Sequence, residues 1–227
     1  MRRLFPPVLL LLLVPGLAFA GAIKGKITYS AEVKTPAAIN TGKYKKACGP
    51  EVINEKLMVT GNALMNVVVS VKGEKLKGKP GEYVLDQNKC RYEPHVTAMM
   101  KGSTLKIHSS DPINHNIHTY SFENDPINIM FTPEQNEYEQ EFEEPEIIKI
   151  ECDLHGWMEA WVVVTENPFF DISGKNGTFT IANVPPGEYT LNAWHELLGS
   201  KSQTVKVGEG DTEVNFNFSD VTPQVSK

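Results

Sequence analysis

Helical periodicity is almost absent from this chain, since apolar residues rarely recur at the three-and-four spacing of an amphipathic helix. The sequence also contains no nucleophile elbow, no glycine-rich loop of the type that cradles phosphate and no zinc-protease helix motif. No internal repeat of solenoid length is visible. These absences leave a strand-rich chain without recognisable hydrolase or nucleotide-binding chemistry.

Basic residues are in the minority, with 22 Lys and Arg against 28 Asp and Glu and a formal net charge of -6. The lysine-rich stretch over residues 72–83 reads as an exposed hairpin loop. An acidic chain without a basic cluster argues against binding to nucleic acid or to anionic membranes. The charge permits a basic protein partner without requiring one.

Long apolar runs are limited to one, near the N-terminus. Arg2–Arg3 precede the run Val8–Val14, and a small-x-small cleavage site ends at Ala20. This is the anatomy of a secretory signal peptide, and the apolar run is too short to span a bilayer. We therefore expect a signal peptide over residues 1–20, cleavage before Gly21, and a periplasmic or secreted chain without stable membrane insertion.

Cysteine is scarce, because the chain has only three. In the oxidising compartment that export implies, an odd cysteine needs an explanation, since a free thiol is a liability there. Cys48 and Cys90 lie in similar turn-like settings, KKACGPE and DQNKCRYEP, and are the expected disulfide. Cys152 is left over, either as a buried inert thiol or as a metal ligand that a metal–thiolate bond would protect.

Strand signals dominate the remainder, as short β-branched runs punctuated by Gly, Pro, Asn and Asp. In IIKIEC, Ile148, Ile150 and Cys152 share one face, so the thiol should point inward at the end of a core strand. The sequence Trp161–Val164 reads as the return strand, and residues 122–146 as a long surface excursion. We predict an all-β domain over residues 21–165 with an N-terminal β extension.

The texture changes after Asn167, where apolar and polar residues alternate cleanly through GTFTIANVPPGEYTLNAW. We predict four strands over residues 166–219, which is small for an independent core. This unit should therefore pack on the preceding domain or be completed by an early strand such as GAIKGKITYS. Residues 220–227 read as a tail.

The sequence CDLHGWM, residues 152–158, carries a thiol, an imidazole and a thioether, each three positions from the next. Thiolate and thioether ligands select copper over hard ions, and imidazole suits copper as well. These side chains can converge only if the chain curls tightly, which Gly156 would ease. A four-coordinate site needs one more imidazole, and NHNIHTYSF upstream offers His115 and His118.

The pair HNIH and CDLHGWM resembles the copper site of the cupredoxins, the blue copper proteins. The spacing Cys-x2-His-x2-Met matches short-loop members of the amicyanin type, whereas plastocyanin has a longer gap. The similarity covers roughly residues 102–164. It implies a cupredoxin-like Greek-key β-sandwich.

The resemblance also implies a type 1 site for one copper ion that cycles between Cu(I) and Cu(II). His115 would be the upstream imidazole, Cys152 the thiolate, His155 the second imidazole and Met158 the weak axial thioether. Asn116 would tie the two ligand loops together by hydrogen bonding.

The C-terminal segment has a second resemblance. GTFTIANVPPGEYTLNAWHE is similar to carboxypeptidase regulatory-like and transthyretin-like sandwich modules, which are not catalytic. It implies an appended small β-sandwich unit without peptidase activity.

Other candidate residues carry weaker signals. His118 lies three residues after His115, so a straight strand would turn it to the opposite face. His95 follows a proline and is expected to be structural or exposed. Asp153 and Trp157 depart from the small cupredoxins, and Asp153 would place a negative charge near the metal and lower its reduction potential unless it turns to solvent.

These expectations describe an exported mononuclear copper protein that transfers single electrons to an unidentified redox partner protein and is not an enzyme on its own. His155 would present its imidazole edge to that partner. One alternative is a periplasmic copper carrier or buffer, which would bind Cu(I) tightly without reversible cycling. Another is a non-redox binding or adhesion module with a structural metal such as zinc, which metal analysis would reveal.

Overall fold

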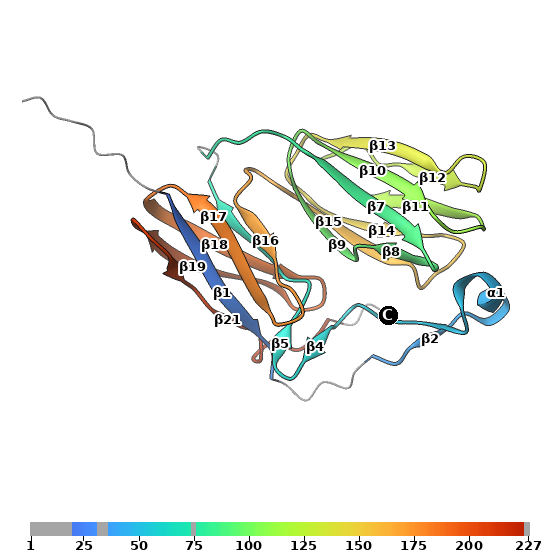
Figure 1. Ribbon diagram of the computed structural model, residues 1–227, viewed down its shortest axis with the longest axis horizontal. Coiled ribbons are helices and arrows are strands. Elements are labelled where there is room, and N and C mark those ends of the chain that lie inside the picture. The colour runs from blue at the N-terminus through green and yellow to red at the C-terminus, as the bar shows by residue number, and fades with distance from the viewer. Residues whose placement is uncertain (1–19, 31–35, 74–75, 225–227) are drawn as a thin grey trace, which may run out of the picture.

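The computed structural model describes residues 20–30, 36–73 and 76–224, and strands dominate it (Figure 1). Within those residues the helical structure is limited to the 3-10 turn η1 (Gly42–Tyr44) and the short helix α1 (Lys45–Cys48). The predicted all-β class is therefore confirmed. Residues 1–19 of the predicted signal peptide lie outside the described residues. In the part described, no helix is long and apolar enough to cross a membrane.

The first sandwich is built from two sheets that face each other across one core (Figure 1). One sheet has the order β13 (Glu137–Phe142), β10 (Ser103–Ser109), β7 (Glu82–Asn88) and β8 (Arg91–Glu93). The other has the order β12 (Asn128–Phe131), β11 (His115–Tyr120), β14 (Ile147–Glu151), β15 (Glu159–Thr165) and β9 (Val96–Met100). The predicted inward face of β14 is confirmed, because Ile148, Ile150 and the following Cys152 are buried.

The second sandwich combines early and late segments of the chain. One sheet has the order β17 (Thr178–Val184), β1 (Gly21–Thr28), β5 (Ala63–Leu64) and β4 (Val59–Thr60), with β20 (Thr212–Glu213) and β21 (Phe216–Asn217) also pairing with β1. The other has the order β16 (Phe170–Ile172), β6 (Val68–Lys72), β18 (Gly187–His195) and β19 (Gly199–Val207). Side chains from both sheets form one hydrophobic cluster.

The early strand β1 completes the C-terminal unit, which was one of the two arrangements predicted. It pairs antiparallel with β17 and parallel with β20 and β21. β6 likewise pairs with β16 and β18, so residues 21–28 and 59–72 share their sheets with the segment after residue 169. The first sandwich therefore lies between β6 and β16 in the sequence, and these two strands are hydrogen-bonded neighbours.

The two sandwiches pack against each other through a separate apolar cluster. Val68 and Trp194 from the second sandwich meet Val96, Ala98 and Val163 from the first. A buried ion pair between His95 and Glu196 joins the same two units. His95 is thus a structural residue at this junction, with its Nδ1 atom 3.0 Å from the Glu159 carbonyl oxygen.

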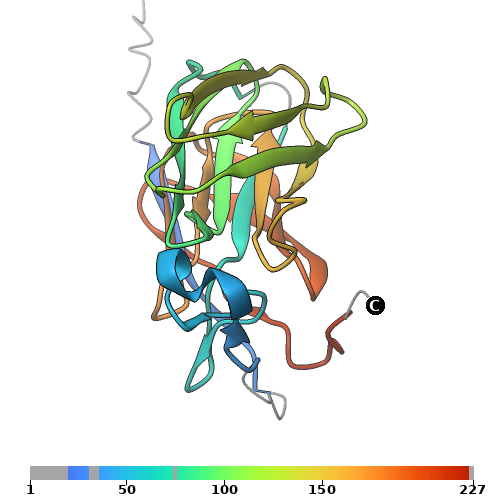
Figure 2. The same cartoon turned by 90° about the vertical axis from the view of Figure 1, so that its right-hand side faces the viewer.

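Residues 36–58, the described part of the chain just before β4, extend to one end of the first sandwich (Figure 2). This segment contains β2 (Ile39–Asn40), η1, α1 and β3 (Glu51–Val52), and the disulfide between Cys48 and Cys90 fastens it there. The predicted disulfide is confirmed.

The expected surface excursion over residues 122–146 is wrong in one respect, because it contains β12 and β13. Both are edge strands, and the alternating burial of β13 leaves its glutamates exposed. Charged residues on an edge strand discourage pairing with other chains. The same charges are typical of a solvated loop, so the sequence did not indicate a strand there.

Candidate metal centre

His115 begins β11 and is fully buried beneath the loop that joins β14 to β15. Its Nε2 atom donates to Asp111 Oδ2 at 2.9 Å, since an ionised carboxylate can only accept. Asp111 also accepts the backbone N–H groups of Lys89 and Cys90, each at 2.7 Å. Burial alone would raise the pKa of Asp111, but these hydrogen bonds lower it. With Nε2 bound to Asp111, the Nδ1 atom of His115 faces inward, the usual arrangement for a histidine ligand held by a carboxylate.

The loop from Cys152 to Met158 curls through two successive turns. The His155 N–H donates to the Cys152 carbonyl at 3.3 Å, and the Met158 N–H donates to the His155 carbonyl at 2.8 Å. The Cys152 N–H closes the loop on the Met158 carbonyl at 3.2 Å. These repeated turns place every third side chain on the inner side of the loop. The side chains of Cys152, His155 and Met158 are all buried there. Gly156 has no positive φ and open space at its Cβ position, so the curl does not depend on glycine.

Three of the predicted ligands converge. The Nδ1 atoms of His115 and His155 lie 3.0 Å apart, and Cys152 Sγ lies 3.6 Å from His155 Nδ1. All three donor atoms lie within 4.8 Å of one another. Nitrogen and sulfur ligands bind a borderline ion at about 2.0–2.3 Å, which is compatible with such separations. Met158 is buried in the same hydrophobic cluster as Cys152.

The Cys152 thiol is disposed to ionise. Burial raises its pKa, but hydrogen bonds from His115, from His155 and from the backbone N–H groups of Asn116 and Leu154 lower it to about 6. The thiolate is the form of cysteine that binds metals. The donor set, two imidazoles and a thiolate in a buried pocket, thus fits a soft or borderline metal ion.

Asn116 links the two ligand segments, as its predicted role requires. Its Oδ1 atom accepts the Asp153 N–H at 2.7 Å, and its Nδ2 atom donates to Asp153 Oδ2 at 2.9 Å. The Tyr92 hydroxyl donates to the Asn116 carbonyl at 2.5 Å. Hydrogen bonds to the side chain and to the carbonyl of Asn116 therefore hold β11, which carries His115, beside the loop that begins at Cys152.

His118 and Asp153 form a surface pair beside the loop that begins at Cys152. Their Nδ1 and Oδ1 atoms lie 3.0 Å apart, and the His118 ring stacks on Tyr120 with 4.6 Å between centroids. A hydrogen bond from His118 lowers the pKa of Asp153, and Asn128 also donates to this carboxylate. Asp153 is about half exposed, so its charge is shared with surface partners.

His155 departs from expectation, because it is 1% exposed. The Tyr44 ring stands edge-on to it at 4.3 Å between centroids, and the Trp157 ring lies at 5.2 Å. Trp157 is itself anchored by its Nε1–H, which donates to the Cys90 carbonyl at 3.1 Å. The prediction that His155 presents an imidazole edge at the surface is therefore wrong.

Sequence reasoning missed Asp111 and Tyr44. Asp111 lies four residues before His115, a spacing that could have drawn attention to it as a carboxylate partner. Tyr44 has no such signal, because nothing in KYKKACG points to an imidazole far along the chain.

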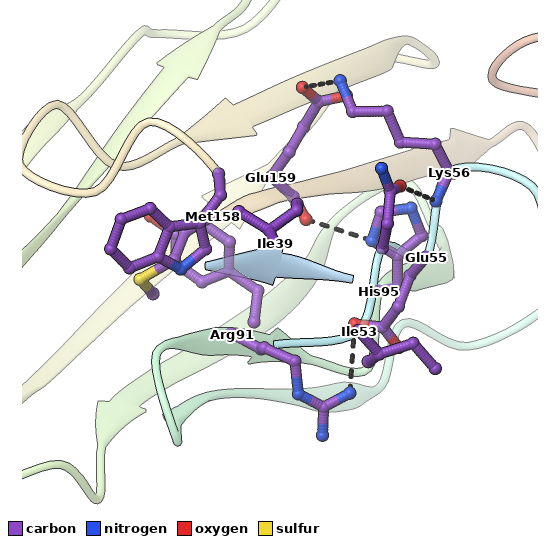
Figure 3. A pocket seen from close by; sticks show the side chains of 11 residues that line it. Ile39, Ile53, Glu55, Lys56, Arg91, His95, Met158 and Glu159 are labelled. Carbon is purple, nitrogen blue, oxygen red and sulfur yellow. Dashed lines mark hydrogen bonds and ion pairs between the residues drawn. The ribbon is translucent and has the colours of Figure 1, made fainter. Parts of the chain in front are cut away.

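A small pocket borders the Met158 side of the loop (Figure 3). His95, Glu159 and Lys56 line it together with Arg91, and a 2.9 Å ion pair joins Lys56 to Glu159. Its volume of about 20 Å³ matches one water molecule.

The fold and the site define an all-β protein of two sandwiches with a candidate metal centre in the first. Residues 169–214 match the family model for polysaccharide lyase family 4, domain II. That model differs from the carboxypeptidase regulatory-like and transthyretin-like modules, so the second resemblance remains a prediction. No curated protein matches the chain.

Solved structures similar to part of the chain include three of copper-protein type. A purple cupredoxin from Nitrosopumilus maritimus is 21% identical, with 37% of this chain and 99% of that chain covered and a TM-score of 0.32. A reduced amicyanin variant is 21% identical, with 42% and 97% covered and a TM-score of 0.34. A Cu-containing nitrite reductase from Thermus scotoductus SA-01 is 16% identical, with 39% of this chain but only 23% of that chain covered and a TM-score of 0.34.

Proposed function

We propose that this protein is an exported mononuclear copper protein that transfers single electrons through a site formed by His115, Cys152, His155 and Met158. The supporting observation is the convergence of two Nδ1 atoms and an ionisable thiol within 4.8 Å in a buried loop. Two histidines and one cysteine with a weak axial methionine form the ligand set of blue-copper electron-transfer sites.

The bound copper ion would supply one-electron chemistry, and the chain would keep its surroundings constant. Asp111 orients His115, and Asn116 ties the two ligand segments together. The buried cluster around Cys152 and Met158 keeps bulk water away from the site. A donor set that is already assembled needs little rearrangement when the charge of the ion changes, which favours fast electron exchange.

The same geometry favours an electron carrier over an enzyme. Catalysis at a metal needs an open coordination position. Met158 is buried in the same hydrophobic cluster as Cys152, and its thioether would fill that position. The proposal therefore includes a redox partner protein and, from the N-terminal sequence, a periplasmic or secreted location.

Copper loading with metal quantitation and a visible spectrum tests the proposal. We expect one copper ion per chain, an intense thiolate-to-copper absorption band and a reversible voltammetric wave. Cys152→Ser should abolish the band while the chain stays folded, whereas serine at the surface residue His118 should leave it intact. Tight Cu(I) binding without a reversible wave would instead support a carrier, and zinc in the natively purified protein would support a structural site.

A further inference from the structure

The imidazole of His155 is covered by the protein itself. Its Nε2 atom is buried and has no hydrogen-bond partner among the described residues. The cover is the segment Thr41–Gly49, here called the cap, together with Trp157. Tyr44 is the cap residue in direct contact with the imidazole, with its ring edge-on at 4.3 Å between centroids. A partner that approaches this side would meet the cap before it could reach His155.

The position of the cap is fixed by a disulfide to the first sandwich and by hydrogen bonds between its own two ends. The disulfide from Cys48 to Cys90 joins the cap to the first sandwich. Thr41 closes the cap on itself, with its N–H donating to the Pro50 carbonyl at 3.2 Å and its hydroxyl donating to the Gly49 carbonyl. Trp157 is held by the carbonyl of Cys90, next to the same disulfide. The two aromatic rings over His155 are therefore fixed to one anchor.

The outer surface of the cap is cationic, although the chain as a whole is acidic. Lys43, Lys45 and Lys46 are exposed, and the Lys43 ammonium lies 5.0 Å from the centroid of the Tyr44 ring. Lys89, next to the disulfide, is exposed as well. Residues 41–50 contain no acidic side chain, whereas the chain carries a net charge of -6.

A second surface near the donor atoms carries exposed apolar side chains and a carboxylate instead of lysines. The loop residue Leu154 is 43% exposed, and Met130 on β12 is 48% exposed. Asp153 lies between Cys152 and Leu154 in sequence and presents a half-exposed carboxylate. Electrons could therefore leave the site beside Asp153 or through the cap, and the charge of the preferred reagent distinguishes these two routes.

We propose that electrons pass between His155 and the surface through the Tyr44 ring, and that the redox partner docks on the lysine-bearing cap with an acidic surface. Electron tunnelling weakens steeply with distance, so the short aromatic contact favours this route. The lysines concentrate an anionic partner at the same spot, because clustered charge of one sign raises the association rate. This inference rests on the proposed copper function.

Oxidation of the reduced copper protein by two small reagents tests the docking surface. One electron moves from the protein to hexacyanoferrate(III), giving hexacyanoferrate(II), or to the cationic tris(phenanthroline)cobalt(III), giving the cobalt(II) complex. The rate constant for oxidation by hexacyanoferrate(III) should fall about tenfold or more when the ionic strength is raised from about 10 mM to about 300 mM. The fall is expected because salt screens the attraction between the anion and the exposed lysines. A rate that rises with salt for the anion and falls for the cation would overturn the proposal in favour of the Asp153 surface.

Charge reversal locates the effect. Lys43→Glu combined with Lys46→Glu should slow hexacyanoferrate about tenfold at low salt. The matched control is Lys175→Glu with Lys206→Glu, which changes the net charge equally at exposed sites on the second sandwich. Equal slowing by both pairs would show that only the overall charge matters, and would overturn the assignment to the cap.

The cover itself can be tested without metal. Diethyl pyrocarbonate modifies accessible neutral histidines, and peptide mass spectrometry locates them. In the metal-free protein His155 should stay protected while the partly exposed His108 reacts. Tyr44→Phe should preserve the protection and Tyr44→Ala should remove it. Rapid modification of His155 in the unaltered protein would overturn the cover, whereas a missing thiolate-to-copper band would overturn the proposed function and the electron route with it, and would leave the cover intact.

Discussion

Asp111→Ala should weaken copper binding and destabilise the fold by separate routes. Asp111 orients His115 through the 2.9 Å bond to Nε2, and loss of such a partner costs about 10–100-fold in metal affinity. The substitution also leaves the N–H groups of Lys89 and Cys90 without their acceptor. Hydrogen bonds to a charged group contribute about 1.5–3 kcal/mol each, so we expect a loss of about 3 kcal/mol after local relaxation.

Competition with a chromophoric Cu(I) chelator measures the affinity, and urea denaturation of the metal-free protein measures the stability. Asp86→Ala is the matched control, because Asp86 accepts the Ser110 N–H at 3.1 Å and pairs with His108 away from the donor atoms. It should reduce stability without changing copper affinity. If Asp111→Ala reduced stability but left the affinity unchanged, packing rather than this carboxylate would orient His115, and the reasoning would fail.

Three further outcomes follow from other contacts. Cys48→Ser with Cys90→Ser should lower the free energy of unfolding by about 2–4 kcal/mol, measured in urea, and expose the capped imidazole to diethyl pyrocarbonate. Burial alone would lower the pKa of His95, but Glu196 raises it. The stabilisation by this pair should therefore be complete below about pH 6.5 and decline as the pH rises through the folded-state pKa. Denaturation curves measured over a range of pH should lose that dependence in Glu196→Gln. Trp194→Ala should cost about 3 kcal/mol in urea denaturation by emptying the junction between the sandwiches.

Local patterns predicted much of the backbone geometry and burial around the candidate site. The alternation in IIKIEC correctly placed Cys152 at the inner end of a strand, because side chains along a strand alternate between its faces. The spacing of Cys152, His155 and Met158 correctly suggested a tight curl, which backbone hydrogen bonds between successive third residues produce. The disulfide was found because the remaining cysteine belonged to the motif.

Non-local contacts were beyond the same reasoning. Tyr44 reaches His155 only because a disulfide and a short helix carry its segment across the end of the first sandwich. Strand β13 was read as a loop, since an edge strand needs few apolar residues to pair on one side. The partners of β1 lie near the other end of the sequence, and no local pattern could identify them beyond the need for a completing strand.

The pairing of β1 with β17, β20 and β21 sets an order of events during synthesis. β1 leaves the ribosome early, but these partners are among the last strands to be made. Residues 82–165, in contrast, contain all the strands that pair within the first sandwich. Because domains generally fold as units once their strands are available, we expect the first sandwich to fold first, while Ile23 and Ile27 of β1 stay unpacked until their partner strands are made. A chain available for folding only up to residue 170 would hold the loop Cys152–Met158 within a complete first sandwich, beside a second sandwich that still lacks β17 to β21.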